Sequence, residues 1–125
     1  MKWLLSLAAL AAQAFAQEEI KKISPEELKQ LLGDKVVFLD VRTPAEIAEL
    51  GTLKGHLNIP IDDLEKRIAE IPKDKRIITA CNAGIRATRA AALLKAKGYD
   101  VIGACGLKGA EGKLDLVRPK ALPQP

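Results

Sequence analysis

Short apolar runs alternate along the chain with longer segments that have helical spacing. The runs VVFLDV at residues 36–41 and RIITAC at 76–81 are nearly continuous in hydrophobicity, as expected for strands buried on both faces of a parallel sheet. Shorter runs at 20–23, 56–60 and 100–105 predict three more strands. The apolar pattern therefore predicts a sheet of about five strands.

Four segments between these runs have the signals of helices. Residues 24–33, SPEELKQLLG, begin with a serine cap, a proline and a capping-box glutamate and end at a glycine. Residues 43–50 begin with a threonine cap, residues 62–71 place aliphatic side chains at helical spacing, and residues 87–97 end before Gly98. Repeated strand and helix units of this length predict an α/β fold, a doubly wound parallel sheet with helices on both faces.

The two ends of the chain differ in composition from the middle. Residues 1–16 combine a lysine, an apolar stretch and the small-residue sequence AFA, which is the pattern of a secretory signal peptide. This stretch is too short to remain as a membrane anchor, so we expect an exported protein, periplasmic in a bacterium. A single domain is expected over 17–116, followed by a flexible, proline-containing tail at 117–125.

Composition limits the partners that the protein can have. The formal net charge is +4 over 125 residues, and the basic residues are interspersed with acidic ones, which argues against nucleic acid and allows a small anionic substrate. One histidine and two well-separated cysteines do not supply a metal site, and the cysteines are not a Cys-x-x-Cys pair. We expect no metal and no cofactor.

Cys81 ends a predicted central strand and is followed by a short loop and a helix. In such a sheet, function collects at the carboxyl ends of strands. Gly84 can adopt positive φ, so that several backbone N–H groups point at one place, and the helix dipole favours a thiolate there. A reactive nucleophile and a buried small hydrophobe are both compatible with this position. The loop consists of Asn82, Ala83, Gly84, Ile85 and Arg86.

Several motifs occur in a recognisable order. Residues 40–46 read DVRTPAE, Gly51 and Gly55 precede the sequence NIP at 58–60, and residues 81–86 have the form Cys-x-x-Gly-x-Arg. In this order and register, the motifs resemble those of the rhodanese domain family. The resemblance implies a rhodanese-like fold and a sulfurtransferase activity.

The resemblance extends over residues 36–101 and assigns roles to individual positions. It implies that Cys81 takes sulfane sulfur from thiosulfate or a persulfide donor and passes it, through a cysteine persulfide, to a thiophilic acceptor. The loop amides from Asn82 to Arg86 would hold the persulfide and the anionic donor. The implied partners are small sulfur donors and acceptors, with a redox or sulfur-acceptor protein as a further possibility.

The resemblance also implies supporting residues and shows departures from the family pattern. Asp40, Arg42 and Glu46 match positions that support the loop through ion pairs. Thr52 stands where many members have histidine, and Ala87 replaces a frequent serine. These departures change the surroundings of the persulfide, whereas the loop itself is intact.

Two other functions are compatible with parts of the pattern. A persulfide carrier or partner-binding module would use the same loop without turnover. A tyrosine phosphatase or arsenate reductase also uses a cysteine, amides and an arginine, but it needs a loop one residue longer than the four residues between Cys81 and Arg86. The shorter loop favours sulfur over a phosphoryl group.

Cys105 ends the last predicted strand much as Cys81 ends its own. In the fold that the sequence resembles, the two strands are neighbours, about 4.8 Å apart. Both thiols could then approach the Cα separation of about 5.5–6 Å that a disulfide prefers. Cys105 is therefore a candidate resolving cysteine, and the alternative is a buried filler that points into one face of the sheet.

Overall fold

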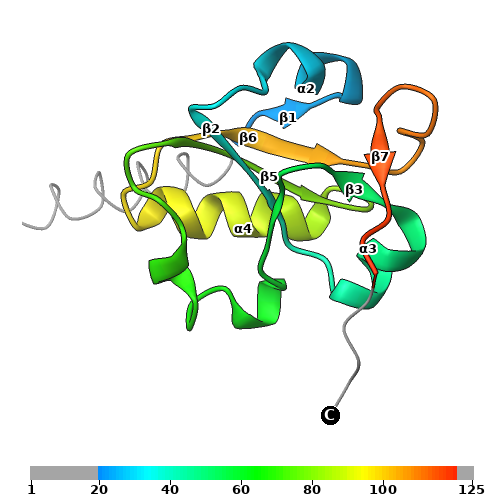
Figure 1. Cartoon of the computed structure of the whole chain (residues 1–125). Coiled ribbons are helices and arrows are strands. Elements are labelled where there is room, and N and C mark those ends of the chain that lie inside the picture. The colour runs from blue at the N-terminus through cyan, green and yellow to red at the C-terminus, as the bar shows by residue number, and fades with distance from the viewer. Residues whose placement is uncertain (1–19, 121–125) are drawn as a thin grey trace, which may run out of the picture.

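The computed structural model describes residues 20–120, so the predicted signal peptide at 1–16 and the end of the predicted tail lie outside the described residues. A five-stranded parallel sheet with strand order β1-β6-β5-β2-β4 runs through the molecule (Figure 1). This sheet confirms the predicted α/β class. Its strands are β1 (Lys22–Ile23), β2 (Val36–Asp40), β4 (Leu57–Asn58), β5 (Arg76–Cys81) and β6 (Val101–Gly106).

The two most apolar strands lie inside the sheet. β5 pairs with β2 on one side and with β6 on the other, and the hydrophobic clusters on the two sides of the sheet bury both of its faces. Asp40 lies opposite Ala80, and Cys81 lies opposite Gly106. The carboxyl ends of the three strands therefore meet at one edge, where the loops of the candidate site begin.

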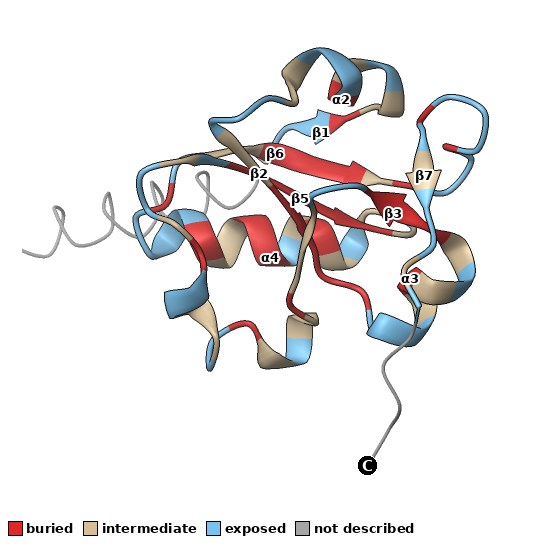
Figure 2. Cartoon of the chain, viewed as in Figure 1, coloured by how far each residue is buried: buried red, intermediate tan, exposed pale blue. Residues whose placement is uncertain are grey.

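Helices cover both faces of this sheet, as predicted. α4 (Ile85–Ala96) packs on one face, and α2 (Pro25–Leu31) lies across the other (Figures 1 and 2). Leu94 of α4 and Leu28 of α2 are fully buried against their faces. Among residues 20–120, no helix has the length and apolar character needed to cross a membrane.

Local caps fix where two of the helices begin. The Ser24 side chain accepts the amide of Glu27, and the Glu27 side chain accepts the amide of Ser24, ahead of α2. Thr43 and Glu46 form the same reciprocal pair at the start of α3 (Pro44–Leu50). Such boxes satisfy N–H groups that lack partners within the helix, and the cap predictions at both helices are confirmed.

The prediction of one amphipathic helix over 62–71 is wrong. The segment forms two separate 3-10 turns, Ile61–Asp63 and Ile68–Glu70. The hydroxyl of Tyr99 donates to the carbonyl of Ile68 at 3.1 Å, and the same carbonyl accepts the amide of Ile71 at 3.1 Å within the second 3-10 turn. The aliphatic side chains of the segment still pack on the α4 face, which explains their helix-like spacing.

A second, two-stranded sheet was not predicted. β3 (Thr52–Leu53) pairs antiparallel with β7 (Leu116–Val117). Val117, the first residue of the predicted tail, therefore belongs to a strand. Gly51 has φ of 86°, which favours glycine, and lets the chain turn into β3 close to β7.

Candidate active site

Cys81 is the last residue of the central strand β5, and its side chain lies on the α4 face. Its Sγ accepts two backbone hydrogen bonds, from the amide of Gly84 at 3.0 Å and from the amide of Ala87 at 3.3 Å. These N–H groups belong to the loop and to the first turn of α4. The predicted convergence of amides on the thiol is therefore present.

The loop turns sharply because Gly84 adopts φ of 96°, a conformation that suits glycine. Two threonines then fix the first turn of α4. Thr88 Oγ1 donates to the carbonyl of Gly84 at 2.8 Å, and the buried Thr79 Oγ1 donates to the carbonyl of Ala87 at 2.7 Å. β5 therefore holds the helix turn that supplies one of the two amides to the sulfur.

Strand β6 and its continuation hold the other side of the loop. The amide of Leu107 donates to the carbonyl of Cys81 at 2.8 Å, and the amide of Lys108 donates to the carbonyl of Asn82 at 2.9 Å. The two bonds continue the pairing of β6 with β5 beyond the end of the strand. The start of the loop is thereby fixed to the sheet.

Gly106 allows this close approach. A Cβ at residue 106 would lie 3.2 Å from the carbonyl oxygen of Asn82, 3.2 Å from the carbonyl carbon of Ala83 and 3.3 Å from the amide nitrogen of Gly84. All three are backbone atoms of the loop, and the Gly84 amide is one of the two donors to Cys81. Because residue 106 has no side chain, the loop can place the Gly84 amide where it donates to Cys81.

The guanidinium of Arg86 is bound by a carboxylate. Its two terminal nitrogens donate to the two oxygens of Glu46, each at 2.8 Å. Glu46 also accepts the amide of Thr43 at 3.1 Å as part of the α3 capping box. Hydrogen bonds from Arg86 are the main cause that lowers the pKa of Glu46 from 4.5 to about 2, so the carboxylate is ionised at neutral pH.

Asp40 and Arg42 form a second, fully buried pair. Arg42 donates from Nε to Asp40 Oδ1 at 3.0 Å and from Nη2 to Oδ2 at 2.8 Å. Arg42 Nη2 also donates to the carbonyl of Gly51 at 2.7 Å, and Thr52 Oγ1 donates to Asp40 Oδ2 at 2.8 Å. The pair ties the end of β2 to the start of β3, and no hydrogen bond joins it to Cys81 directly.

The structure separates the two cysteines. Cys105 pairs with Ala80, and its side chain joins the cluster on the α2 face, whereas Cys81 belongs to the cluster on the α4 face. Both thiols are free, and burial raises the pKa of Cys105 to about 11. Because successive strand residues point to opposite faces, this geometry opposes the predicted resolving role and favours the alternative of a buried filler.

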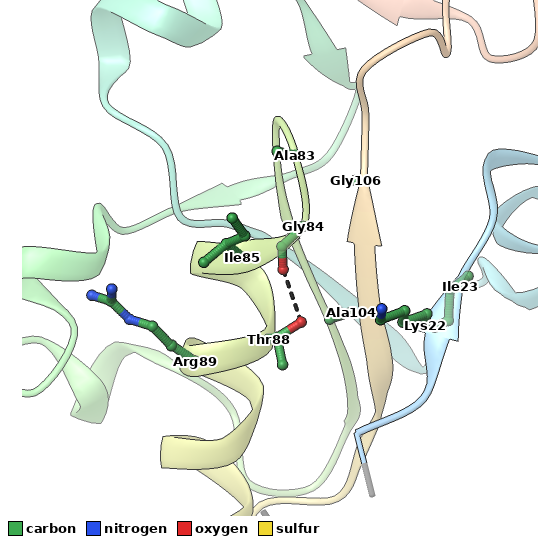
Figure 3. A pocket seen from close by; sticks show the side chains of 9 residues that line it. All are labelled: Lys22, Ile23, Ala83, Gly84, Ile85, Thr88, Arg89, Ala104 and Gly106. Atoms are coloured by element: carbon green, nitrogen blue, oxygen red, sulfur yellow. Dashed lines mark hydrogen bonds between the residues drawn. The ribbon is translucent and has the colours of Figure 1, made fainter. Parts of the chain in front are cut away.

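A hollow of about 400 Å³ lies on the outer side of the loop. Figure 3 shows Thr88 and Arg89 of α4 on one side of it and Lys22 and Ile23 of β1 on the other. Most of its lining residues are small or aliphatic, and two are cations. The full lining is Lys22, Ile23, Ala83, Gly84, Ile85, Thr88, Arg89, Ala104 and Gly106.

The predicted site residues fall into two groups. The structure brings Cys81, its loop and Glu46 together, and it places the Asp40 and Arg42 pair behind them. Two positioning residues, Thr79 and Gly106, carry no local signal in the sequence because Thr79 acts through a contact with helix α4 and Gly106 through a contact with the loop. Within residues 20–120, no group of three or more histidine, cysteine or acidic residues is arranged to hold a metal ion.

Comparison with known proteins places this geometry in a family. A model described as the Rhodanese-like domain matches residues 24–106. A sulfurtransferase from Allochromatium vinosum is 39% identical over 82 residues, which cover 64% of this chain and 76% of that protein. Thiosulfate sulfurtransferase/rhodanese-like domain-containing protein 3 from Mus musculus is 32% identical over 93 residues, which cover 63% of this chain and 59% of that protein.

The solved structures agree with these matches. A rhodanese-related protein from Thermoplasma volcanium is 25% identical and superposes with a TM-score of 0.71, covering 79% of this chain and 99% of that one. The chain therefore belongs to the rhodanese-like domain family and is homologous to sulfurtransferases.

Proposed function

We propose that the protein is a sulfurtransferase that carries sulfane sulfur on Cys81. The observation that supports this most directly is the pair of amides, from Gly84 and Ala87, that donate to Cys81 Sγ at 3.0 and 3.3 Å. The thiol needs to be ionised to act as a nucleophile. Backbone N–H groups and the start of a helix favour that anion without any side-chain base.

The transfer consists of two displacements. The Cys81 thiolate attacks the outer sulfur of the donor and forms a new S–S bond, and the donor's own S–S bond breaks with its electron pair leaving on sulfite or on a thiolate. The thiolate of the acceptor then attacks the outer sulfur on Cys81. This second step returns Cys81 as a thiolate and leaves the sulfur on the acceptor.

Intact-mass measurement after incubation with thiosulfate tests the first displacement. We expect wild-type protein to gain one sulfur atom, Cys81→Ala to gain none, and Cys105→Ala to behave as wild type, because the two thiols lie on opposite faces of the sheet. Sulfur found on Cys105 in the wild type, or undiminished loading of Cys81→Ala, would show that the nucleophile is misassigned.

Steady-state turnover with thiosulfate and cyanide tests the second displacement. Repeated release of thiocyanate is expected from an enzyme. A persulfide that forms on Cys81 but is never discharged would instead identify a carrier, the alternative that uses the same loop.

A further inference from the structure

The charge of the loop arginine is paired with a carboxylate. Both terminal nitrogens of Arg86 donate to Glu46, and about a third of each side chain is exposed. An anionic donor that used Arg86 would have to displace a carboxylate already bound at two points. Such two-point pairs of guanidinium and carboxylate are among the stronger polar contacts in proteins.

Glu46 is itself held in place from the other side. Its Oε1 accepts the amide of Thr43 at 3.1 Å and the hydroxyl of Thr43 at 3.2 Å, while its own amide donates back to that hydroxyl at 3.2 Å. Rotating Glu46 away from Arg86 would therefore also break the cap of α3. The ion pair is a fixed part of the site, and its net charge is zero.

The remaining side chains near the sulfur are uncharged. Asn82, Ala83, Ile85 and Ala87 complete the loop and the helix start, and Ile85 is 68% exposed. The hollow beside the loop adds aliphatic walls (Figure 3). Apart from Thr88 and the exposed cations Lys22 and Arg89, the lining of this hollow is apolar, and apolar walls favour an organic group over a strongly hydrated dianion.

Other cations lie around the loop but face water. Lys22, Arg89 and Lys108 are all exposed, so solvent and salt screen their charges. They attract anions in general, without the fixed geometry that a guanidinium facing the sulfur would provide. The donor preference therefore depends on whether Arg86 is neutralised.

We propose that Glu46 is a specificity-determining residue: by neutralising Arg86 it makes the site prefer a persulfide carried on an organic thiol over dianionic thiosulfate. This inference rests on the proposed sulfurtransferase function. The Cys81 thiolate attacks the outer sulfur of the organic persulfide, the new S–S bond forms, and the carrier leaves as a thiolate with the electron pair of the broken bond. The hollow beside the loop receives the organic part of the donor.

The first test compares two donors, 2-hydroxyethyl persulfide and thiosulfate, by kcat/KM. Wild-type protein is expected to prefer the persulfide by at least tenfold. Glu46→Gln removes the carboxylate charge, keeps the side-chain size and leaves the charge of Arg86 without a counter-charge, so the ratio of persulfide to thiosulfate use is expected to fall by roughly tenfold or more. The matched control is Glu49→Gln, an exposed residue of the same helix that makes no ion pair among the described residues; its ratio is expected to stay at the wild-type value.

A second readout needs no sulfur transfer. Iodoacetate and iodoacetamide alkylate the same thiol but differ in charge, so the ratio of their rates at Cys81 reports the charge at the sulfur. The rate with iodoacetate divided by the rate with iodoacetamide is expected to rise several-fold in Glu46→Gln and to stay constant in Glu49→Gln. Measuring it in the Cys105→Ala background removes any contribution from the other thiol.

The outcomes separate the inference from the proposed function. Equal donor ratios and equal alkylation ratios in wild type and Glu46→Gln would overturn the role of Glu46, even if sulfur transfer is efficient. A wild-type protein that prefers thiosulfate would also overturn it, whether or not the variant folds. If neither donor loads wild-type Cys81 while the alkylation ratio still rises in Glu46→Gln, the sulfurtransferase proposal fails and the donor assignment fails with it.

Discussion

At the scale of single residues, the candidate site depends on a glycine at position 106, where a side chain would collide with the loop. Gly106 has no Cβ, and the space is filled by backbone atoms of the loop, including the amide nitrogen of Gly84 at 3.3 Å from where a Cβ would be. That amide donates to Cys81 Sγ. A methyl group at residue 106 therefore requires the loop and strand β6 to shift relative to each other by a few tenths of an ångström.

Gly106→Ala is therefore expected to slow the reaction of Cys81 more than it destabilises the fold. A shift of a few tenths of an ångström weakens the hydrogen bond from Gly84, so alkylation by iodoacetamide at pH 7 should slow several-fold. The free energy of unfolding, measured by thermal denaturation, should change by no more than about 1 kcal/mol. Gly33→Ala is the control, because nothing lies within 4 Å of its Cβ position, and a similar slowing in that variant would refute the positioning role.

Sequence alone could find the nucleophile and could not find its supports. Cys81 and Gly84 stand in a short local motif, so their roles could be inferred from order along the chain. Gly106 and Thr79 act through contacts with the loop and with α4. Such contacts depend on strand register and on the packing of a helix, which no local pattern encodes.

At the scale of elements, α3 connects helix capping to the charge of the site. Glu46 serves as the third residue of the α3 cap and as the partner of Arg86, which lies 40 residues away in the sequence. A local motif and a long-range ion pair thus share one carboxylate. The threonine cap of α3 is visible in the sequence, whereas the pairing of Glu46 with Arg86 requires α3 to lie beside the loop.

Because folding lowers the pKa of Glu46, the stabilisation from its ion pair with Arg86 depends on pH. A carboxyl whose pKa falls from 4.5 to about 2 on folding stabilises the fold above its unfolded pKa and loses that stabilisation as the pH falls toward 2. Because about a third of the side chain is exposed, solvent screening reduces the contribution to roughly 1–2 kcal/mol. Glu46→Gln should lose this amount at pH 7.

Urea unfolding at pH 7 and near pH 2.5 measures the effect. The difference between wild type and Glu46→Gln is expected to shrink steadily between these two values. Glu49→Gln, which changes the same charge on the same helix, should follow the wild type at both. A difference that is constant with pH would mean that the ion pair does not stabilise the fold.

The elements that the sequence did not predict have two different physical origins. β3 and β7 are two residues long each, which is too short for any alternation to appear. The segment 61–71 has the apolar spacing of a helix, yet it forms two 3-10 turns, and the Tyr99 hydroxyl donates to the carbonyls of Ile68 and Ile71 at its end. Tertiary contacts overrode the local preference in that segment, whereas the long helix α4 and the central strands were predicted correctly.

At the scale of the whole molecule, the sheet separates the two thiols into different environments. The α/β class followed from the repeating units, but the face to which each cysteine points depends on register, since a shift of one residue reverses it. β5 and β6 pair so that Cys105 lies opposite Ala80 and Cys81 opposite Gly106. Cys81 therefore joins α4 and the loop, and Cys105 joins the cluster that contains Leu28 of α2.

This separation predicts different fates under oxidation. Cys81 is held by two amides at the edge of the sheet, whereas burial raises the pKa of Cys105 to about 11 and keeps it a thiol. Because the thiolate is the form that reacts, mild peroxide should modify Cys81 and leave Cys105 free. Peptide mapping under acid-quenched, non-reducing conditions distinguishes the two. A Cys81–Cys105 disulfide in folded protein would require the strands to rearrange and would contradict the register. Cys105→Ala, which removes only a buried filler, should cost about 1 kcal/mol of stability and leave the oxidation of Cys81 unchanged.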